Sequence, residues 1–279
     1  MEPRPTSVSA LLDHHDGILL DAYGVLVDAR GVLPHTAALF RELARRDTPY
    51  AIVTNDASRS PVTYARRFAG YGIEIAPERF VTSGSLLPAY FRDRGLAGAR
   101  TLVLGTPDSY AFVREGGGVP IELVPDLALD AVAICDDSGT PFLEGIERAL
   151  SGVIRAVEQG RRPALVLPNP DLVYPKGGGE LGFTAGAMAL LVEAALARRF
   201  PGEALVFDRL GKPAPHLFEA AAARLGIPRD RLVMVGDTLE TDIAGAQAAG
   251  IATALLAEIS RWDPAAPVAP TYLLATIEP

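Results

Sequence analysis

Short apolar runs alternate with longer stretches of helical periodicity along most of the chain. The runs GILLD (17–21) and YAIVTN (50–55) have the length and composition of buried strands. A segment with the spacing of an amphipathic helix lies between them at 35–46. Alternating strands and helices are typical of parallel sheets built from βαβ units. The pattern therefore predicts an α/β fold.

Residues 22–32, AYGVLVDARGV, lie between the first strand and its helix. This segment is too short for a domain and too rich in β-forming residues for a plain loop. We expect a small β-hairpin there.

A second alternating series begins with TLVLG (101–105) and ends with PALVLPN (163–169). The stretch PNPDLVYPKGGGELG follows it, is rich in glycine and proline, and shows no periodicity. This arrangement predicts a smaller α/β unit at 84–176, inserted into a core formed by residues 1–83 and 177–279.

Downstream of the insert, the pattern predicts a long amphipathic helix over 183–199 and strands at 204–208 and 231–237. A helix is expected over 241–250, followed by a final strand. The tail at 263–272 contains three prolines and reads as an extended surface segment.

Charge and composition narrow the possible partners. The formal net charge is -8 and no dense run of Lys or Arg occurs, so neither nucleic acid nor an anionic membrane is an expected partner. A small molecule is favoured instead.

No run of about 18 apolar residues is present, and the N-terminus lacks the features of a signal peptide. Cys135 is the single cysteine, so no internal disulfide can form and the reducing cytoplasm is the expected compartment.

Polar side chains stand where three of the predicted strands end. Asp21 and Asp237 each close an apolar run, and Thr54 and Asn55 close another. Ligands of open parallel sheets bind beyond the carboxyl ends of the strands, so these side chains are expected to converge. Buried carboxylates that lie close together need a compensating cation. Magnesium fits such oxygen ligands, whereas one cysteine and four histidines make a zinc site improbable.

Two further residues, Asp242 and Lys212, extend this candidate site. Asp242 lies five residues after Asp237, where it can support a metal site or cap the following helix. The Thr54 hydroxyl and the Asn55 backbone N–H can bind an anionic oxygen. Lys212 precedes a predicted helix and can direct its ammonium group toward the strand ends, although a solvated surface lysine is the alternative. Its place in the chain, between Thr54 and Asp237, favours the site.

These elements, Asp21 in DAYGVL, Thr54 in VTND, Lys212 in LGKP and the pair of acids in GDTLETD, resemble the four motifs of the haloacid dehalogenase-like superfamily. The short interval between the first two motifs leaves no room for a cap domain, but the long interval before Lys212 does. This arrangement is similar to the class IIA branch, which includes nitrophenyl-phosphatase-like and nucleotide-monophosphate phosphatase-like enzymes. The resemblance implies a Rossmann-like core with an inserted α/β cap.

The resemblance also implies a Mg2+-dependent hydrolase that acts on a small phosphorylated metabolite. Asp21 would attack phosphorus to form an acyl phosphate, and Lys212 and Thr54 would hold the developing charge. The metal ligands would be Asp21, the Tyr23 backbone carbonyl and Asp237, with Asp242 in the same motif. Caps of this branch often mediate dimers, so a homodimer through the cap is possible.

Tyr23 departs from the pattern of the superfamily, whose phosphatases usually carry a second aspartate at this position as general acid and base. Absence of this second aspartate should leave a slow phosphatase, since general acid–base catalysis is worth about 10² to 10⁴ in rate. Asp56 is the nearest substitute in sequence. Two alternatives stay open: a catalytically impaired protein that binds a metabolite, and a metal-independent 2-haloacid dehalogenase, whose first motif also carries tyrosine.

Overall fold

The structure is a computed structural model that describes residues 2–260 and 262–279. The chain divides into two compact units. We call them the core domain (Met1–Thr54, Pro61–Val81 and Lys212–Pro279) and the insert domain (Asn55–Ser60 and Thr82–Gly211). The chain first crosses from the core domain to the insert domain directly after Thr54 and returns to the core domain for the last time at Lys212.

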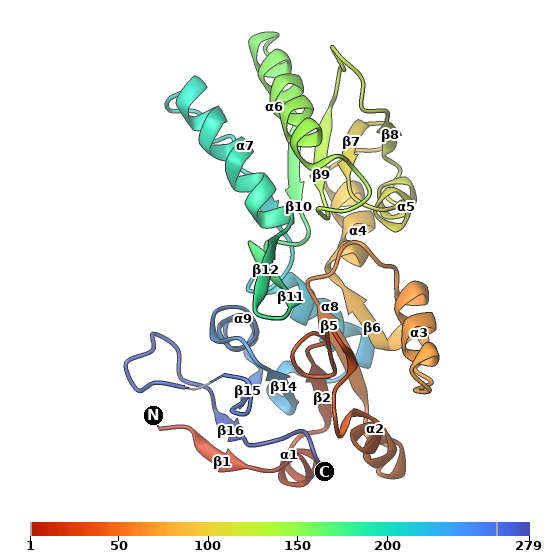
Figure 1. The fold of residues 1–279 in the computed structure, drawn as a ribbon, viewed down its shortest axis with the longest axis vertical. Helices are drawn as coiled ribbons and strands as arrows, with labels where there is room; N and C mark the ends of the chain where they lie inside the picture. The colour runs from red at the N-terminus through yellow and green to blue at the C-terminus, as the bar shows by residue number, and fades with distance from the viewer. Residues whose placement is uncertain (1, 261) are drawn as a thin grey trace. The chain divides into compact units, whose positions relative to one another are not determined.

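The core domain contains a seven-stranded sheet (Figure 1). Neighbouring strands are parallel from β1 through β5. In spatial order the strands are β1 (Arg4–Thr6), β16 (Tyr272–Leu274), β15 (Ala252–Leu256), β14 (Leu232–Gly236), β2 (Gly17–Leu20), β5 (Tyr50–Thr54) and β6 (Phe80–Thr82). The α/β class expected from the sequence is confirmed.

Side chains on both faces of this sheet are buried, because successive residues of a strand point to opposite faces. Ile18 and Leu20 of β2 pack in one cluster with residues of α1 (Val8–His14), α2 (Thr36–Arg45) and α3 (Pro61–Gly70). Leu19 is fully buried but lies outside that cluster, as expected for a side chain on the opposite face. Burial of each such side chain stabilises the fold by about 1.5–3 kcal/mol.

Two more helices of the core domain contact the sheet. Helix α8 (His216–Leu225) contacts β5, and α9 (Ala244–Ala248) contacts β15. The small hairpin expected after the first strand is confirmed as β3 (Val27–Asp28) paired antiparallel with β4 (Gly31–Val32). Short 3-10 turns at Pro77–Arg79 and Arg229–Arg231 lead into β6 and β14.

The insert domain has its own parallel sheet of five strands. Helices α4 (Leu87–Asp93) and α5 (Pro107–Glu115) pack on one face, and α6 (Phe142–Glu158) and α7 (Ala185–Arg199) pack on the other. A 3-10 turn at Ser83–Leu86 precedes α4. The strand order is β13 (Asp208–Arg209), β10 (Ala164–Leu167), β9 (Ala131–Ile134), β7 (Arg100–Leu104) and β8 (Val119–Ile121).

The second unit extends beyond the boundary at 176/177 that the sequence suggested. Residues 177–211 belong to it, because α7 packs against α6 and β13 pairs with β10. The glycine- and proline-rich stretch, expected to be a loop, forms the hairpin β11 (Val173–Gly177) and β12 (Glu180–Phe183).

The strand expected at 204–208 is wrong except at its last residue. Only Asp208–Arg209 pair with β10. The backbone before them is turned to local partners: Leu205 N–H donates to the Glu203 carbonyl and Phe207 N–H donates to the Glu193 carboxylate. These donors are therefore not available for a ladder. The tail expected to be an extended surface segment at 263–272 forms no helix, and only its last residue lies in a strand, because Tyr272–Leu274 pair with β15 and β1.

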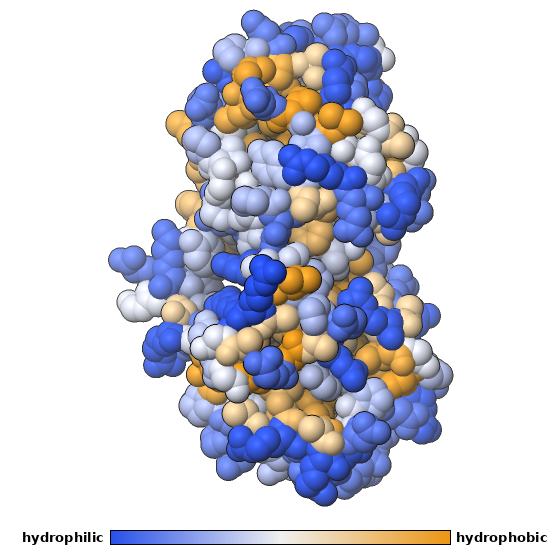
Figure 2. Space-filling view, turned by 90° about the vertical axis from the view of Figure 1, so that its right-hand side faces the viewer, coloured by the Kyte–Doolittle hydropathy of each residue, from blue (hydrophilic) through white to orange (hydrophobic). Residues whose placement is uncertain are grey.

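Figure 2 shows apolar side chains in small patches among polar and charged ones, which is ordinary for a globular protein. Among residues 2–260 and 262–279, no helix is both long enough and apolar enough to cross a bilayer.

Candidate active site

Asp21 and Asp237 leave the core sheet side by side. Strands β2 and β14 are parallel neighbours with Leu20 opposite Val235, and each aspartate lies within two residues of that pair. The Asp21 N–H donates to the Val235 carbonyl at 2.9 Å. Carboxylate oxygens of Asp21, Asp237 and Asp242 lie within 4.8 Å of one another. The convergence expected from the strand ends is present in the core domain.

Lys212 is buried among these acids, with 3% of its surface exposed. Its Nζ donates to Asp21 Oδ1 and to Asp242 Oδ1, each at 2.6 Å, and to the Val53 carbonyl at 3.4 Å. Three acceptors thus face the three protons of the ammonium group. The solvated-lysine alternative does not describe this side chain.

Asp242 accepts hydrogen bonds from three groups of the site. It lies in a π turn at Leu239–Ile243, which precedes α9 where the sequence pattern indicated a regular helix. Its Oδ1 accepts from Lys212, and its Oδ2 accepts from the backbone N–H groups of Asp237 and Thr238 at 3.2 and 3.1 Å. Because donors occupy both oxygens, Asp242 is suited to orient Lys212 and the Asp237 backbone.

The site carries more negative than positive charge. Burial raises the pKa of the Asp21 carboxyl, Lys212 opposes that shift, and Asp242 and Asp237 add to it. Burial and Asp242 raise the pKa of Asp237 to about 6. Burial alone would lower the pKa of Lys212, but the Asp21 and Asp242 carboxylates raise it above its usual range. Lys212 therefore stays protonated.

This arrangement fits a divalent cation. Three carboxylates and one ammonium group leave about two negative charges in a buried site, which is costly without a counterion. All candidate ligand atoms are oxygens, the donors that Mg2+ prefers. The residues present thus fit the Mg2+ that the sequence suggested, with Asp21 and Asp237 as the carboxylates best placed to hold it.

Gly24 lets the turn after Asp21 approach Asp237. Its φ is +90°, and a Cβ at this position would lie 2.1 Å from Asp237 Oδ2. The backbone carbonyl of Tyr23 precedes this glycine in the same turn, which suits its expected role as a ligand. Sequence reasoning did not identify Gly24 as a site residue, although a glycine three positions after Asp21 was the visible signal.

Gly24→Ala should disrupt the metal site, because the new methyl group collides with the Asp237 carboxylate. We expect weaker Mg2+ binding by at least about tenfold, measured by calorimetry. Gly72→Ala is the matched control, since Gly72 also has a positive φ (+76°) but nothing lies within 4 Å of its Cβ position. Equal Mg2+ affinity in the two variants would contradict this account.

Thr54 and Asn55 diverge after the end of β5. Thr54 is the last residue of that strand and is buried, with 6% of its surface exposed. The Asn55 side chain instead binds within the insert domain, where its Nδ2 donates to Asp171 Oδ1 at 2.8 Å. Asp171 N–H in turn donates to Asn169 Oδ1 at 3.1 Å. The sequence pattern did not identify Asp171 as the partner of Asn55.

The Tyr23 side chain points toward the β3–β4 hairpin. Its ring packs against the hydrophobic cluster of the core domain, and the backbone of Ala29 hydrogen-bonds its hydroxyl. Burial raises the pKa of Tyr23, and the nearby Asp28 carboxylate raises it further. The phenol is therefore anchored at the hairpin.

Asp56, the possible substitute acid, is engaged by its own loop. Its Oδ1 accepts from the Ser58 N–H, the Ser58 hydroxyl and the Arg59 N–H at 2.6–3.1 Å. Its Oδ2 accepts from the Arg59 guanidinium at 2.6 Å. These contacts give Asp56 a structural role in the insert domain.

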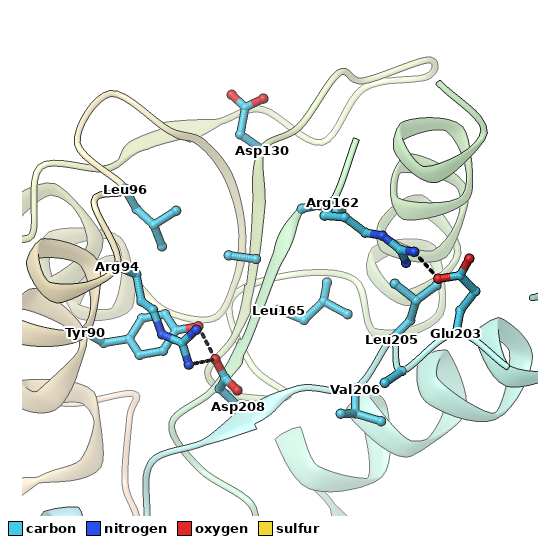
Figure 3. A pocket seen from close by; sticks show the side chains of 13 residues that line it. Tyr90, Arg94, Leu96, Asp130, Arg162, Leu165, Glu203, Leu205, Val206 and Asp208 are labelled. Carbon is cyan, nitrogen blue, oxygen red and sulfur yellow. Dashed lines mark hydrogen bonds and ion pairs between the residues drawn. The ribbon is translucent and has the colours of Figure 1, made fainter. Parts of the chain in front are cut away.

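A cavity of about 530 Å³ in the insert domain is a second place to consider (Figure 3). Arg94 and the Tyr90 hydroxyl both donate to the Asp208 carboxylate, and Arg162 pairs with Glu203. Its positive charges are thus matched by adjacent carboxylates. Residues at the amino ends of the β9 and β10 strands line it, whereas parallel sheets bind ligands beyond the carboxyl ends. It has none of the chemistry of the Asp21 site.

Sequence comparisons agree with the geometry. The family profile described as haloacid dehalogenase-like hydrolase matches residues 18–118, and one described as HAD-hydrolase-like matches residues 209–278. Glycerol-3-phosphate phosphatase of Gallus gallus is 30% identical over 259 residues, which cover 88% of this chain and 80% of that protein.

Solved structures extend the likeness to the whole fold. A possible sugar phosphatase from Cytophaga hutchinsonii has a TM-score of 0.85 and 28% identity, and the match covers 99% of each chain. A glycerol phosphate phosphatase from Mycobacterium tuberculosis, solved in complex with magnesium, has a TM-score of 0.80 and 27% identity over 98% of this chain and 78% of that one. With its buried lysine and acids at the strand ends, the chain belongs to the haloacid dehalogenase-like hydrolases.

Proposed function

We propose that the chain is a Mg2+-dependent phosphatase that acts on a small phosphorylated metabolite through a phospho-aspartate at Asp21. The observation that carries this proposal is the contact of Asp21 with Lys212, next to Asp237 and Asp242, at the carboxyl edge of the core sheet. Similarity to several named phosphatases supports the reaction class.

In this proposal each residue has a separate task. The Asp21 carboxylate attacks phosphorus, and Lys212 neutralises charge on the nucleophile and on the phosphoryl oxygens. Thr54 contributes its hydroxyl at the end of β5. Asp242 is a positioning residue that holds the Lys212 ammonium group at 2.6 Å. Bound Mg2+, held by Asp21, Asp237 and the Tyr23 carbonyl, would stabilise negative charge on the transferring phosphoryl group.

Removal of Mg2+ tests this assignment. A chelator should lower phosphate release from a phosphomonoester such as 4-nitrophenyl phosphate by at least about 100-fold, and added Mg2+ should restore it. Mg2+ should also raise the melting temperature of the wild type but not of Asp237→Asn. The exposed Asp230→Asn is the control and should respond to Mg2+ like the wild type. Phosphate release that is unchanged by the chelator would refute the proposal.

Two alternative functions predict other results. A 2-haloacid dehalogenase would release halide from 2-haloacids whether or not the chelator is present. A metabolite-binding protein on this scaffold would bind a phosphorylated ligand without turnover. Tyr23 in place of a carboxylate is the observation that favours this second reading.

We also propose a homodimer formed through the insert domain. Large apolar side chains are exposed on β12 and on α7, two elements in contact with each other: Leu181 and Phe183 on the strand, and Leu190 and Leu191 on the helix. The mass in solution, measured by light scattering, distinguishes a dimer from a monomer.

The cytoplasm is the proposed compartment, since Cys135 is buried and carries a free thiol.

A further inference from the structure

In the core domain, the protons of the Lys212 ammonium group next to Asp21 already form hydrogen bonds. When a phosphate ester is cleaved, the leaving oxygen takes the electron pair of the P–O bond, and a proton donor in contact with it speeds the step. Lys212 is the charged donor in contact with Asp21, and its protons face Asp21, Asp242 and the Val53 carbonyl. An ammonium group held in this way stabilises charge but is not placed to give up a proton.

Tyr23 and Asp56, the other two candidates from the sequence, have their own partners. The Tyr23 phenol packs on the hydrophobic cluster, and its oxygen accepts a hydrogen bond from the Ala29 backbone N–H at the β3–β4 hairpin. Both oxygens of the Asp56 carboxylate, which follows the β5 strand by two residues, accept from Ser58 and Arg59. An ionised carboxylate surrounded by donors is an acceptor. The Asp56 carboxylate therefore acts as an acceptor within its own loop, and the Tyr23 phenol is held at the hairpin.

We propose that this site selects phosphoryl donors whose leaving group is weakly basic: acyl phosphates, phosphoanhydrides and acidic aryl phosphates, in preference to alkyl phosphates. The inference rests on the proposed phosphatase function and adds the substrate class to it. In the first step Asp21 Oδ bonds to phosphorus, the bond from phosphorus to the leaving oxygen breaks, and that oxygen departs as an anion without a proton. Only a leaving group that is stable as an anion completes this step rapidly.

The second step has the same requirement in reverse. Water must attack phospho-Asp21, the bond from phosphorus to Asp21 must break, and the electron pair must return to the carboxylate while the water proton passes to solvent. Lys212, the side chain that contacts Asp21, already donates to two carboxylates and is not placed to take that proton. The phospho-aspartate is therefore expected to outlast the first step and to accumulate during turnover.

A series of aryl phosphates tests the inference. Ring substituents change the acidity of the phenol with little change in size, and kcat/KM reports the step that forms phospho-Asp21. We expect kcat/KM to fall steeply as the phenol becomes more basic and to be lower by about 10² to 10⁴ for a simple alkyl phosphate than for 4-nitrophenyl phosphate. Rapid mixing should also show a burst of 4-nitrophenolate close to one per active site.

A carboxyl group at position 23 should relieve the requirement. Tyr23→Asp is expected to raise kcat/KM for alkyl phosphates by about 10² to 10⁴ and to flatten the aryl series. Tyr71→Asp makes the same replacement at an exposed tyrosine of the core domain and should leave the slope unchanged. If Tyr23→Asp fails to fold, the slope and the burst of the wild type still decide the matter.

The outcomes separate this inference from the proposed function. A flat aryl series in the wild type, with alkyl phosphates cleaved as fast as 4-nitrophenyl phosphate, overturns the inference and leaves the phosphatase assignment intact. Absence of phosphate release from every donor, with no effect of Asp21→Asn, overturns both. A steep series without a burst refutes the accumulation of phospho-Asp21.

Discussion

Asp21→Asn should lower kcat for phosphate release by on the order of 10⁴ to 10⁶, the range for loss of a nucleophile. An amide nitrogen or oxygen cannot form the acyl phosphate, whereas the rest of the site stays in place. The fold should survive, because the change removes one of three mutually repelling carboxylates and Lys212 keeps its contact with Asp242. Urea unfolding should therefore show no loss of stability relative to the wild type.

The matched control is Asp230→Asn, which makes the same replacement at an exposed position of the core domain. It should keep both activity and stability. Phosphate release by Asp21→Asn at the wild-type rate would remove Asp21 from the role of nucleophile. A covalent phosphate found on the wild type but not on Asp21→Asn, detected by intact-mass measurement after acid quenching, would give direct support.

Lys212→Met should affect stability as well as rate. Methionine leaves Asp21 and Asp242 buried without their shared cation, and removal of one partner of a buried pair costs about 3–5 kcal/mol. We expect a loss of that size in the free energy of unfolding, measured with urea in the absence of metal. Loss of the charge that stabilises the transferring group should also lower kcat by about 10² to 10³.

Added Mg2+ should restore part of the stability of Lys212→Met, because a bound cation compensates the same carboxylates. Lys176→Met is the control, since Lys176 is the other lysine of the chain and is exposed on β11. It should unfold at the same urea concentration as the wild type. A Lys212→Met protein as stable as this control in the absence of metal would show that the buried charge is compensated in another way.

The strand ends of the core domain could be predicted because two independent signals coincide there. Apolar runs define β2 and β14, and the aspartates that follow them have few structural reasons to be buried. The sheet rule for parallel strands then brings Asp21 and Asp237 together without further information. Their contact with Lys212 required the order of the motifs, because GKP alone is an ordinary surface sequence.

Other parts of the site depend on tertiary contacts that leave little trace in the sequence. The contact of Asn55 with Asp171 joins residues far apart in the chain. The hairpin of β11 and β12 lies in a stretch whose glycines and prolines signal a loop. Strand β13 is short because its upstream backbone donors bind Glu193 and Glu203, which no periodicity reveals.

The chain first leaves the core domain directly after Thr54, comes back for Pro61–Val81, and returns for the last time at Lys212. Strand β5 fixes Thr54, and Lys212 is held by its contacts with Asp21 and Asp242. A different insert could therefore replace Thr82–Gly211 while the reactive residues keep their places. We expect such an exchange to change which molecules are accepted and to leave the chemistry of Asp21 unaltered.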